Sequence, residues 1–204
     1  MNIRRIVVGL ELGKLSDQAL RRAMSLAREF DARLDVVHGS GVETPSLGPS
    51  RRAFFAEYAE RARESARAAA RGKLELLVED PRYAGMPLDD YLHVQDGDGA
   101  EALLAFAQQN AADLIVLGAH RHRALLDFGG TGRAVLAASP CPVWVEPAEA
   151  HRFERVLAPI DLSPTTGLVL TAARSLAARF SVPVRVLHVF LPPEFAFPPG
   201  GVHI

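Results

Sequence analysis

Several features that define large classes of proteins are scarce in this sequence. The single cysteine, Cys141, excludes an intrachain disulfide and agrees with a reducing compartment. Long apolar runs are missing too, because stretches such as Leu114–Leu117 fall far short of the roughly 18 residues of a membrane-spanning helix. Net charge is nearly absent, with 23 basic and 24 acidic residues, so no whole-chain field favours nucleic acid or an anionic membrane. We therefore expect a soluble, cytoplasmic protein that binds neither nucleic acid nor a membrane.

Motifs for catalysis are also missing. The chain has no P-loop lysine, no Ser/His/Asp spacing and no pair of glutamates suited to acid–base chemistry. His120 and His122, followed by Asp127, are candidate metal ligands, but loop histidines beside arginines are usually solvated. Cys141 stands between two prolines before an apolar strand, which favours a small core residue over a nucleophile. The sequence thus predicts neither an enzyme nor a metal site.

What the sequence does contain is an internal repeat. An offset of 150 residues superposes Arg5–Glu11 on Arg155–Asp161 without a gap and pairs His38 with His188. Each copy shows an apolar strand ended by an acidic residue, a helix with apolar residues three and four apart, and a second strand. In the second copy, Ser163-Pro164 predicts the start of the helix. The repeat therefore predicts two β-α-β units.

The first copy continues into a full domain, whereas the second stops. After the first copy, helices and strands are expected in alternation at residues 51 to about 83, 88–94, 102–110, 114–117, 133–138 and 143–145. Asp98 and Glu101 have capping-box spacing before the helix at 102–110. This alternation predicts a doubly wound, five-stranded parallel α/β sheet for residues 1–148. Residues 151–204 supply only the opening β-α-β unit of a second domain.

The carboxyl ends of the parallel strands are the expected place for a binding site, because helix N-termini there present free amides to anions. A glycine-rich run directly precedes the helix at 133–138, so its amides are placed to cradle a phosphate while the Thr131 hydroxyl donates a further bond. Glycines that only turn the chain explain the same pattern. The candidate binding residues are Glu11, Gly39, Leu117, Gly118, Arg121, Gly129, Gly130 and Thr131.

A resemblance to a known family rests on three stretches: residues 112–120, the glycine-rich loop, and residues 139–145. Together they resemble the C-terminal signature of the universal stress protein family, and the opening strand with Glu11 and His38 resembles its N-terminal half. The similarity covers residues 3–147, and residues 154–190 resemble the start of a second such domain, as in tandem members. It implies a five-stranded, adenine nucleotide alpha hydrolase-like domain that is usually dimeric. A subset of the family binds ATP through a loop of the form G-x2-G-x9-G-[ST].

The chain departs from that ATP-binding loop at several points. Gly118 matches the first glycine, but Arg121 stands at the second, and the loop from Gly118 to Gly129-Gly130-Thr131 is one or two residues short. Glu11 replaces the aspartate that the family usually has after the first strand. The Arg121 side chain either blocks the close backbone approach that glycine allows or grips a phosphate itself. We therefore expect ATP binding to be weak or lost.

Three functions fit these observations. The first is a non-enzymatic stress-response protein that acts through dimerisation and protein association. The second is an ATP-binding switch of the same family, in which the nucleotide changes the dimer geometry. The third is a nucleotide hydrolase, which needs a general base near the γ-phosphate, with Glu11, His120 and His122 as candidates. We expect the first function and rank the hydrolase last.

The second unit is too small to stand alone. A β-α-β unit of about 50 residues covers only one face of its strands and falls below the size at which one core is self-sufficient. The last strand of the first domain presents an apolar edge that is open to pairing. We therefore predict that the second unit packs either on the first domain or on its copy in a second chain. We favour the second chain, which gives a homodimer formed through the segment 151–204, with its tail 191–204 near the contact, and through Val143, Trp144 and Val145.

Overall fold

The structure is a computed structural model that describes residues 2–12, 15–42, 49–74, 80–83, 87–118, 129–147 and 152–190. The chain divides into two compact units, Asn2–Ala150 and His151–Ile204. The first unit holds a five-stranded sheet and the second a two-stranded sheet. Within these described ranges, every helix is too short or too polar to cross a membrane.

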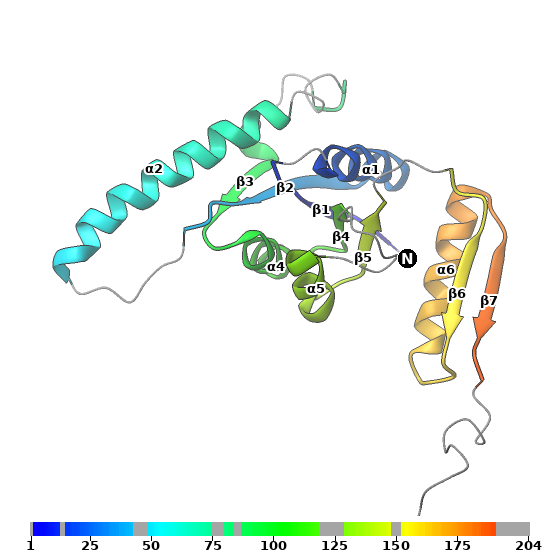
Figure 1. Ribbon diagram of the computed structural model, residues 1–204. Coiled ribbons are helices and arrows are strands. Elements are labelled where there is room, and N and C mark those ends of the chain that lie inside the picture. The colour runs from blue at the N-terminus through cyan, green and yellow to red at the C-terminus, as the bar shows by residue number, and fades with distance from the viewer. Residues whose placement is uncertain are drawn as a thin grey trace, which may run out of the picture. The chain divides into compact units, whose positions relative to one another are not determined.

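A parallel sheet of five strands forms the centre of the first unit (Figure 1). In chain order the strands are β1 (Arg5–Gly9), β2 (Arg33–Gly39), β3 (Leu92–Gln95), β4 (Leu114–Gly118) and β5 (Val143–Glu146). Their spatial order is β3-β2-β1-β4-β5, so the chain winds outward from β1 to one edge and then crosses to the other. The doubly wound, five-stranded α/β sheet predicted from the sequence is confirmed.

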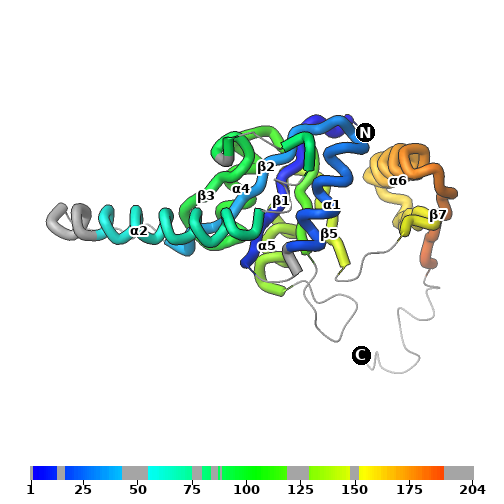
Figure 2. The backbone as a smooth tube through the Cα atoms, turned by 90° about the horizontal axis from the view of Figure 1, so that it is seen from above, coloured from blue at the N-terminus to red at the C-terminus, as the bar shows by residue number. Residues whose placement is uncertain are grey.

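Helices cover both faces of this sheet. Helix α1 (Leu15–Phe30) packs on one face, and α4 (Gly99–Gln109) and α5 (Gly129–Ala138) lie on the other (Figures 1 and 2). Because both faces are covered, the middle of the central strand β1 is apolar: Ile6, Val7 and Val8 are each 0% exposed. The long helix α2 (Pro49–Lys73) contacts β2 and β3 and extends past that edge of the sheet (Figure 2), and the short 3-10 helix η1 (Leu88–Asp90) precedes β3.

Two elements have other bounds than the sequence predicts. Helix α2 ends at Lys73 and not near residue 83, because Leu74 turns into the core, where it is 1% exposed. Strand β3 begins at Leu92 and not near residue 88, because residues 88–90 form η1. In both cases a local apolar or helical pattern was overridden by packing between distant parts of the chain.

The second unit repeats the opening of the first. It consists of β6 (Val156–Ile160), α6 (Thr166–Phe180) and β7 (Val184–His188), and its two strands are parallel. His188 Nδ1 lies 2.9 Å from the carbonyl oxygen of Ile160, and His38 Nδ1 lies 2.8 Å from that of Leu10, and in each case the partners are 28 positions apart in the sequence. The two copies therefore share the same contact between their strands as well as similar sequences. That the unit is part of a second domain of the same kind stays a prediction.

The helix of the second unit begins later than expected. It starts at Thr166, whereas Ser163-Pro164 lies in a turn before it. The Ser163 hydroxyl accepts a hydrogen bond from the Thr165 N–H at 3.3 Å, so it stabilises this turn and does not cap the helix itself.

Within residues 152–190, a helix packs on one side of the two strands of the second unit. Helix α6 packs against β6 from one side, where Ala158 is 2% exposed. On the opposite side Leu157 is 56% exposed and Leu187 is 45% exposed. The equivalent residues of the first unit, Val7 and Val37, are 0% and 2% exposed, because they pack with α4 in one core cluster. The second unit thus exposes positions that a complete unit buries.

Candidate functional site

The carboxyl ends of β1, β2 and β4 meet at one edge of the first sheet. Gly39 is the last residue of β2 and Gly118 the last of β4, while Glu11 follows β1 and is exposed to solvent. Leu117 contributes only its backbone here, because its side chain is 6% exposed and belongs to the core cluster with α4. The structure therefore brings four of the predicted binding residues to the edge where ligands of such sheets bind.

Gly39 is required by a close approach of two backbones. A Cβ atom added at Gly39 would lie 2.8 Å from both the carbonyl carbon and the carbonyl oxygen of Asp98, and 2.9 Å from the nitrogen of Gly99. Such distances are shorter than any van der Waals contact, and the atoms involved are backbone atoms that cannot rotate away. The absent side chain thus lets the end of β2 touch the start of α4, which gives this predicted residue a packing role.

The N-terminus of α4 is closed by its own side chains. The Asp98 carboxylate accepts hydrogen bonds from the N–H groups of Ala100 and Glu101 at 2.8 and 2.9 Å, and Glu101 accepts from the Asp98 N–H at 3.4 Å. The capping box predicted from the sequence is confirmed. Two N–H groups in the first turn of α4 therefore already donate to the Asp98 carboxylate, so the N-terminus of α4 is poorly suited to bind an anionic ligand.

The N-terminus of α5 is built differently. The glycine-rich run predicted to precede this helix is in fact its first turn, which starts at Gly129 with a φ of 63°. The N–H groups of a first turn have no partner within their own helix. A Cβ at Gly130 would meet nothing within 4 Å, and the Thr131 methyl group lies 3.8 Å from where a Cβ on Gly99 would be. The first turn of α5 thus lies beside the start of α4.

An ion pair that the sequence analysis missed fixes the β3 side of the edge. Arg63 of α2 donates two hydrogen bonds to Asp96, at 2.7 and 2.6 Å, and the Ser40 hydroxyl donates a third at 3.3 Å. The hydrogen bonds from Arg63 lower the pKa of Asp96 below its ordinary value. Because 33 residues separate Arg63 from Asp96, no local pattern in the sequence could indicate this pair. It ties α2 to the edge.

Two residues with possible chemistry have structural surroundings. The ring of His38 meets the carbonyl of Leu10 and so links the ends of β1 and β2. Cys141 packs against the core cluster, and burial raises the pKa of its thiol, which keeps it in the poorly nucleophilic protonated form. Among the described residues, no three His, Cys, Asp or Glu side chains gather closely enough to hold a metal ion.

The sequence and fold of this chain can be compared with those of known proteins. The model of the universal stress protein family matches residues 2–147. The chain belongs to this family. The match spans the whole five-stranded unit, in agreement with the resemblance seen in the sequence. No curated protein matches the chain.

Solved structures of universal stress proteins share the fold. UspA from Lactobacillus plantarum is 20% identical, covers 71% of this chain and 98% of its own, and has a TM-score of 0.52. A putative universal stress protein from Pseudomonas aeruginosa is 15% identical and covers 95% of this chain at a TM-score of 0.54, while this chain spans 64% of it. A universal stress protein in complex with cAMP is 20% identical over 73% of this chain and 100% of its own, at a TM-score of 0.44. At identities of 20% or less, these similarities show a shared fold alone.

Most of the loop that the sequence analysis compares with the ATP-binding loop of the family, residues 119–128, lies outside the described residues. Residues 119–128 contain Arg121, and also His120, His122 and Asp127, which were considered as metal ligands or bases. The structure therefore places Glu11, Gly39, Leu117, Gly118, Gly129, Gly130 and Thr131 around one edge of the sheet. The predicted role of Arg121 stays a prediction.

Proposed function

We propose that this universal stress protein acts through association with other protein chains, without catalysis and with ATP bound weakly or not at all. The observation that carries the proposal is the exposure of apolar side chains on the strands of the second unit, where Leu157 and Leu187 are 56% and 45% exposed. Exposed apolar patches on soluble proteins commonly mark interaction sites. The single cysteine, which suits a reducing compartment, supports a cytoplasmic location.

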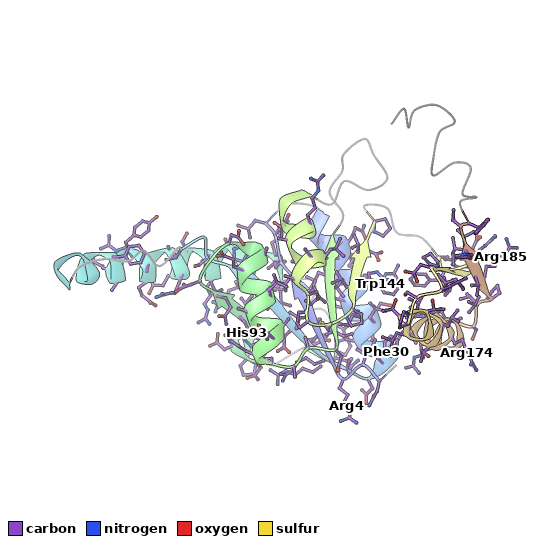
Figure 3. All side chains as sticks on the ribbon, turned by 90° about the horizontal axis from the view of Figure 1, so that it is seen from below. Arg4, Phe30, His93, Trp144, Arg174 and Arg185 are labelled. Carbon is purple, nitrogen blue, oxygen red and sulfur yellow. The ribbon has the colours of Figure 1, made fainter. Side chains whose placement is uncertain are left out.

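Strand β5 offers a second surface for association. It is the last strand in the order of the sheet, so one edge has no strand partner among the described residues. Trp144 on this strand (Figure 3) donates from its indole N–H to the carboxylate of Glu146 at 2.9 Å, and Arg22 of α1 donates to the same oxygen at 2.8 Å. These bonds fasten β5 to α1. The edge position of β5 supports the inclusion of Val143, Trp144 and Val145 in the proposed homodimer.

The oligomeric state tests this proposal directly. We expect light scattering to show a dimer for the 204-residue chain. A version that ends at Glu149 keeps β5 and lacks the second unit, so it is expected to associate more weakly. A full chain that is strictly monomeric, with a second unit that resists proteolysis, would contradict the proposal, because the apolar face would then need no partner chain.

An ATP-binding switch is the second candidate function. It is favoured by the glycine-rich first turn of α5, because helix N-termini bind phosphate and a Cβ at Gly130 would meet nothing within 4 Å. Against it stand Glu11 in place of aspartate, Arg121 in place of glycine, and the shortened loop. A nucleotide hydrolase would need a base as well, and of its candidates Glu11 alone lies among the described residues.

Calorimetric titration with ATP and magnesium separates the two candidates. We expect no measurable heat, or a dissociation constant well above the low micromolar range, with cAMP as a second nucleotide in the same assay. Arg121→Gly alone should restore little binding, because the loop length stays unchanged. A low micromolar constant for the unmodified protein would favour the switch. In that case Thr131→Val should weaken binding about 10-fold through the loss of one hydrogen bond to phosphate.

A further inference from the structure

A small pocket lies at the amino-terminal edge of the first sheet, opposite the edge where Gly39 and Gly118 end their strands. Its volume is about 310 Å³, which is near the lower limit for pockets that hold small molecules. The neighbouring strands β2 and β3 (Figure 1) both begin beside it, because Arg33 is the first residue of β2 and Tyr91 directly precedes β3. The pocket is therefore separate from the candidate site at the carboxyl edge.

The pocket combines a buried floor with a charged rim. The floor is the set of lining residues that are buried, namely Ala32, Leu34, Tyr83 and Tyr91. The rim is the set of lining residues that are charged and exposed, namely Arg33, Arg82 and Asp90. An apolar and aromatic floor with a few polar groups beside it is the usual construction of a pocket for an organic molecule. Among the residues of the rim, cations outnumber anions.

The two tyrosines of the floor carry hydroxyl groups without a partner. Tyr83 is 7% exposed and Tyr91 is 3% exposed, and their rings meet edge to face with centroids 6.0 Å apart. Within the part of the chain that the structure describes, neither phenol oxygen takes part in a hydrogen bond. Burial raises the pKa of both phenols, so both stay protonated and able to donate. Buried tyrosine hydroxyls usually have a partner, so this pair points to an acceptor that enters the pocket from outside.

The rim supplies further hydrogen-bond donors. Arg33 donates through Nε to Asp35 at 3.1 Å and through Nη2 to the Asp90 carbonyl at 2.8 Å, so among the described residues its Nη1 has no acceptor. Arg82 donates through Nη2 alone, at 3.3 Å, to the exposed carboxylate of Asp31. A guanidinium group has five N–H donors in one plane, and its geometry matches that of a carboxylate. The rim thus retains donors that an anionic group of a ligand can use.

Backbone hydrogen bonds hold the walls of the pocket in place. The Asp80 carbonyl accepts from the Tyr83 N–H at 2.9 Å, and the Asp80 carboxylate accepts from the Arg82 N–H at 3.0 Å, so a tight turn positions both lining residues. The Tyr91 carbonyl accepts from the Val36 N–H at 2.7 Å, which fixes Tyr91 to β2. Because these walls are already ordered, a ligand loses little affinity to ordering them.

We propose that this pocket binds a small aromatic carboxylate, whose ring packs on the floor and whose charge is met by the tyrosine hydroxyls and Arg82. The flat apolar body is inferred from the two aromatic rings and Leu34 in the floor. The negative charge is inferred from the unpartnered phenols and the guanidinium donors beside them. The volume of about 310 Å³ suits a ligand with a single ring.

Benzoate is the probe that tests this pocket in the full chain. Titration followed by NMR of the isotope-labelled protein should give saturable shifts at the amides of Arg33, Tyr83 and Tyr91, with a dissociation constant of about 1 mM or lower. Benzamide has nearly the same shape without the charge and should bind at least about 10-fold more weakly. Shifts confined to other residues, or no saturation up to about 10 mM benzoate, would overturn the proposal. Equal binding of benzamide would overturn the requirement for a negative charge.

Removal of single oxygen atoms separates a role in binding from a role in packing. Tyr83→Phe and Tyr91→Phe keep the rings and should each weaken benzoate binding about 10-fold, because each loses one hydrogen bond to a charged group. The urea midpoint of both variants should stay unchanged, since these hydroxyls have no partner to lose among the described residues. Tyr58→Phe is the matched control, because Tyr58 is exposed on α2 outside the pocket and should not affect benzoate binding.

Arg82→Gln tests the charge at the rim and should also weaken benzoate binding about 10-fold. Arg82 is exposed and pairs only with an exposed carboxylate, so this variant should fold like the original chain. Tyrosine variants that bind benzoate as tightly as the original chain, or that lose stability in place of binding, would overturn the proposal. These measurements depend neither on the oligomeric state nor on ATP, so their failure leaves the proposed association standing.

Discussion

Replacement of Gly39 by alanine is expected to lower the free energy of unfolding of the first unit by about 3 kcal/mol, near the upper end of the usual cost of overpacking. The added Cβ would lie 2.8 Å from the Asp98 carbonyl and 2.9 Å from the Gly99 nitrogen. Relief requires a shift of β2 or of the first turn of α4, and both are held in the core. Urea unfolding followed by circular dichroism measures the difference.

A matched glycine shows whether the loss comes from this contact. A Cβ at Gly72, near the end of α2, would meet nothing within 4 Å, so Gly72→Ala should leave stability unchanged or raise it by up to about 1 kcal/mol. If Gly39→Ala is as stable as the original protein, the start of α4 is able to move. In that case the carboxyl edge of the sheet could accommodate a ligand through a shift of the first turn of α4.

The fold could be predicted because its signals are local and repeated. Each central strand is a short apolar run, and the residue offset between the two copies fixes which strands correspond. The cap of α4 was predictable for the same reason, since Asp98 and Glu101 are three residues apart and complete the whole motif. Where the residues that form a motif lie within a few positions of one another, the sequence is sufficient to predict that motif.

The site was predicted only in part, because its geometry depends on distant residues. The sequence placed Gly39 at the right edge, but the requirement for glycine comes from Asp98, on another element. The Arg63–Asp96 pair spans α2 and the end of β3 in the same way. The glycine-rich run beside α5 was correctly identified, but it forms the first turn of the helix and does not precede it. The helix can start there because glycine at position 129 adopts a positive φ.

Asp35 is the clearest residue that sequence patterns gave no reason to select. It lies in the middle of the apolar strand β2, is 1% exposed, and would ordinarily be costly to bury. His93 and Arg33 donate hydrogen bonds to its Oδ1 at 2.9 and 3.1 Å, and the Arg5 guanidinium lies 3.3 Å from Oδ2. Phe106 stacks on the His93 ring at 4.4 Å between centroids. The carboxylate thus joins β1, β2 and β3 through side chains that reach it from three strands.

Replacement of Asp35 by asparagine should lower the free energy of unfolding by about 3 kcal/mol at neutral pH, since it removes the negative charge that faces Arg5 and Arg33 and turns one acceptor oxygen into an NH2 donor. Burial raises the pKa of Asp35, but the hydrogen bonds from His93 and Arg33 outweigh burial, and the pKa lies below its ordinary value of 3.8. A carboxyl group with a lowered pKa stabilises the fold above the pKa of the unfolded chain, and this contribution is lost as the pH falls through the folded value.

The difference between the original protein and Asp35→Asn should therefore stay constant from neutral pH to about pH 4 and shrink below it, because the original protein alone loses stability there. Asp31→Asn is the matched control: its side chain is 97% exposed, and its φ of 51° lies in the region that asparagine tolerates well. Its stability should remain within about 0.5 kcal/mol of the original at every pH, because exposed ion pairs contribute little. Urea unfolding of the three proteins along a pH series measures these differences. A gap for Asp35→Asn that persists unchanged into strong acid would show that the loss comes from the shape of the amide and not from the missing charge.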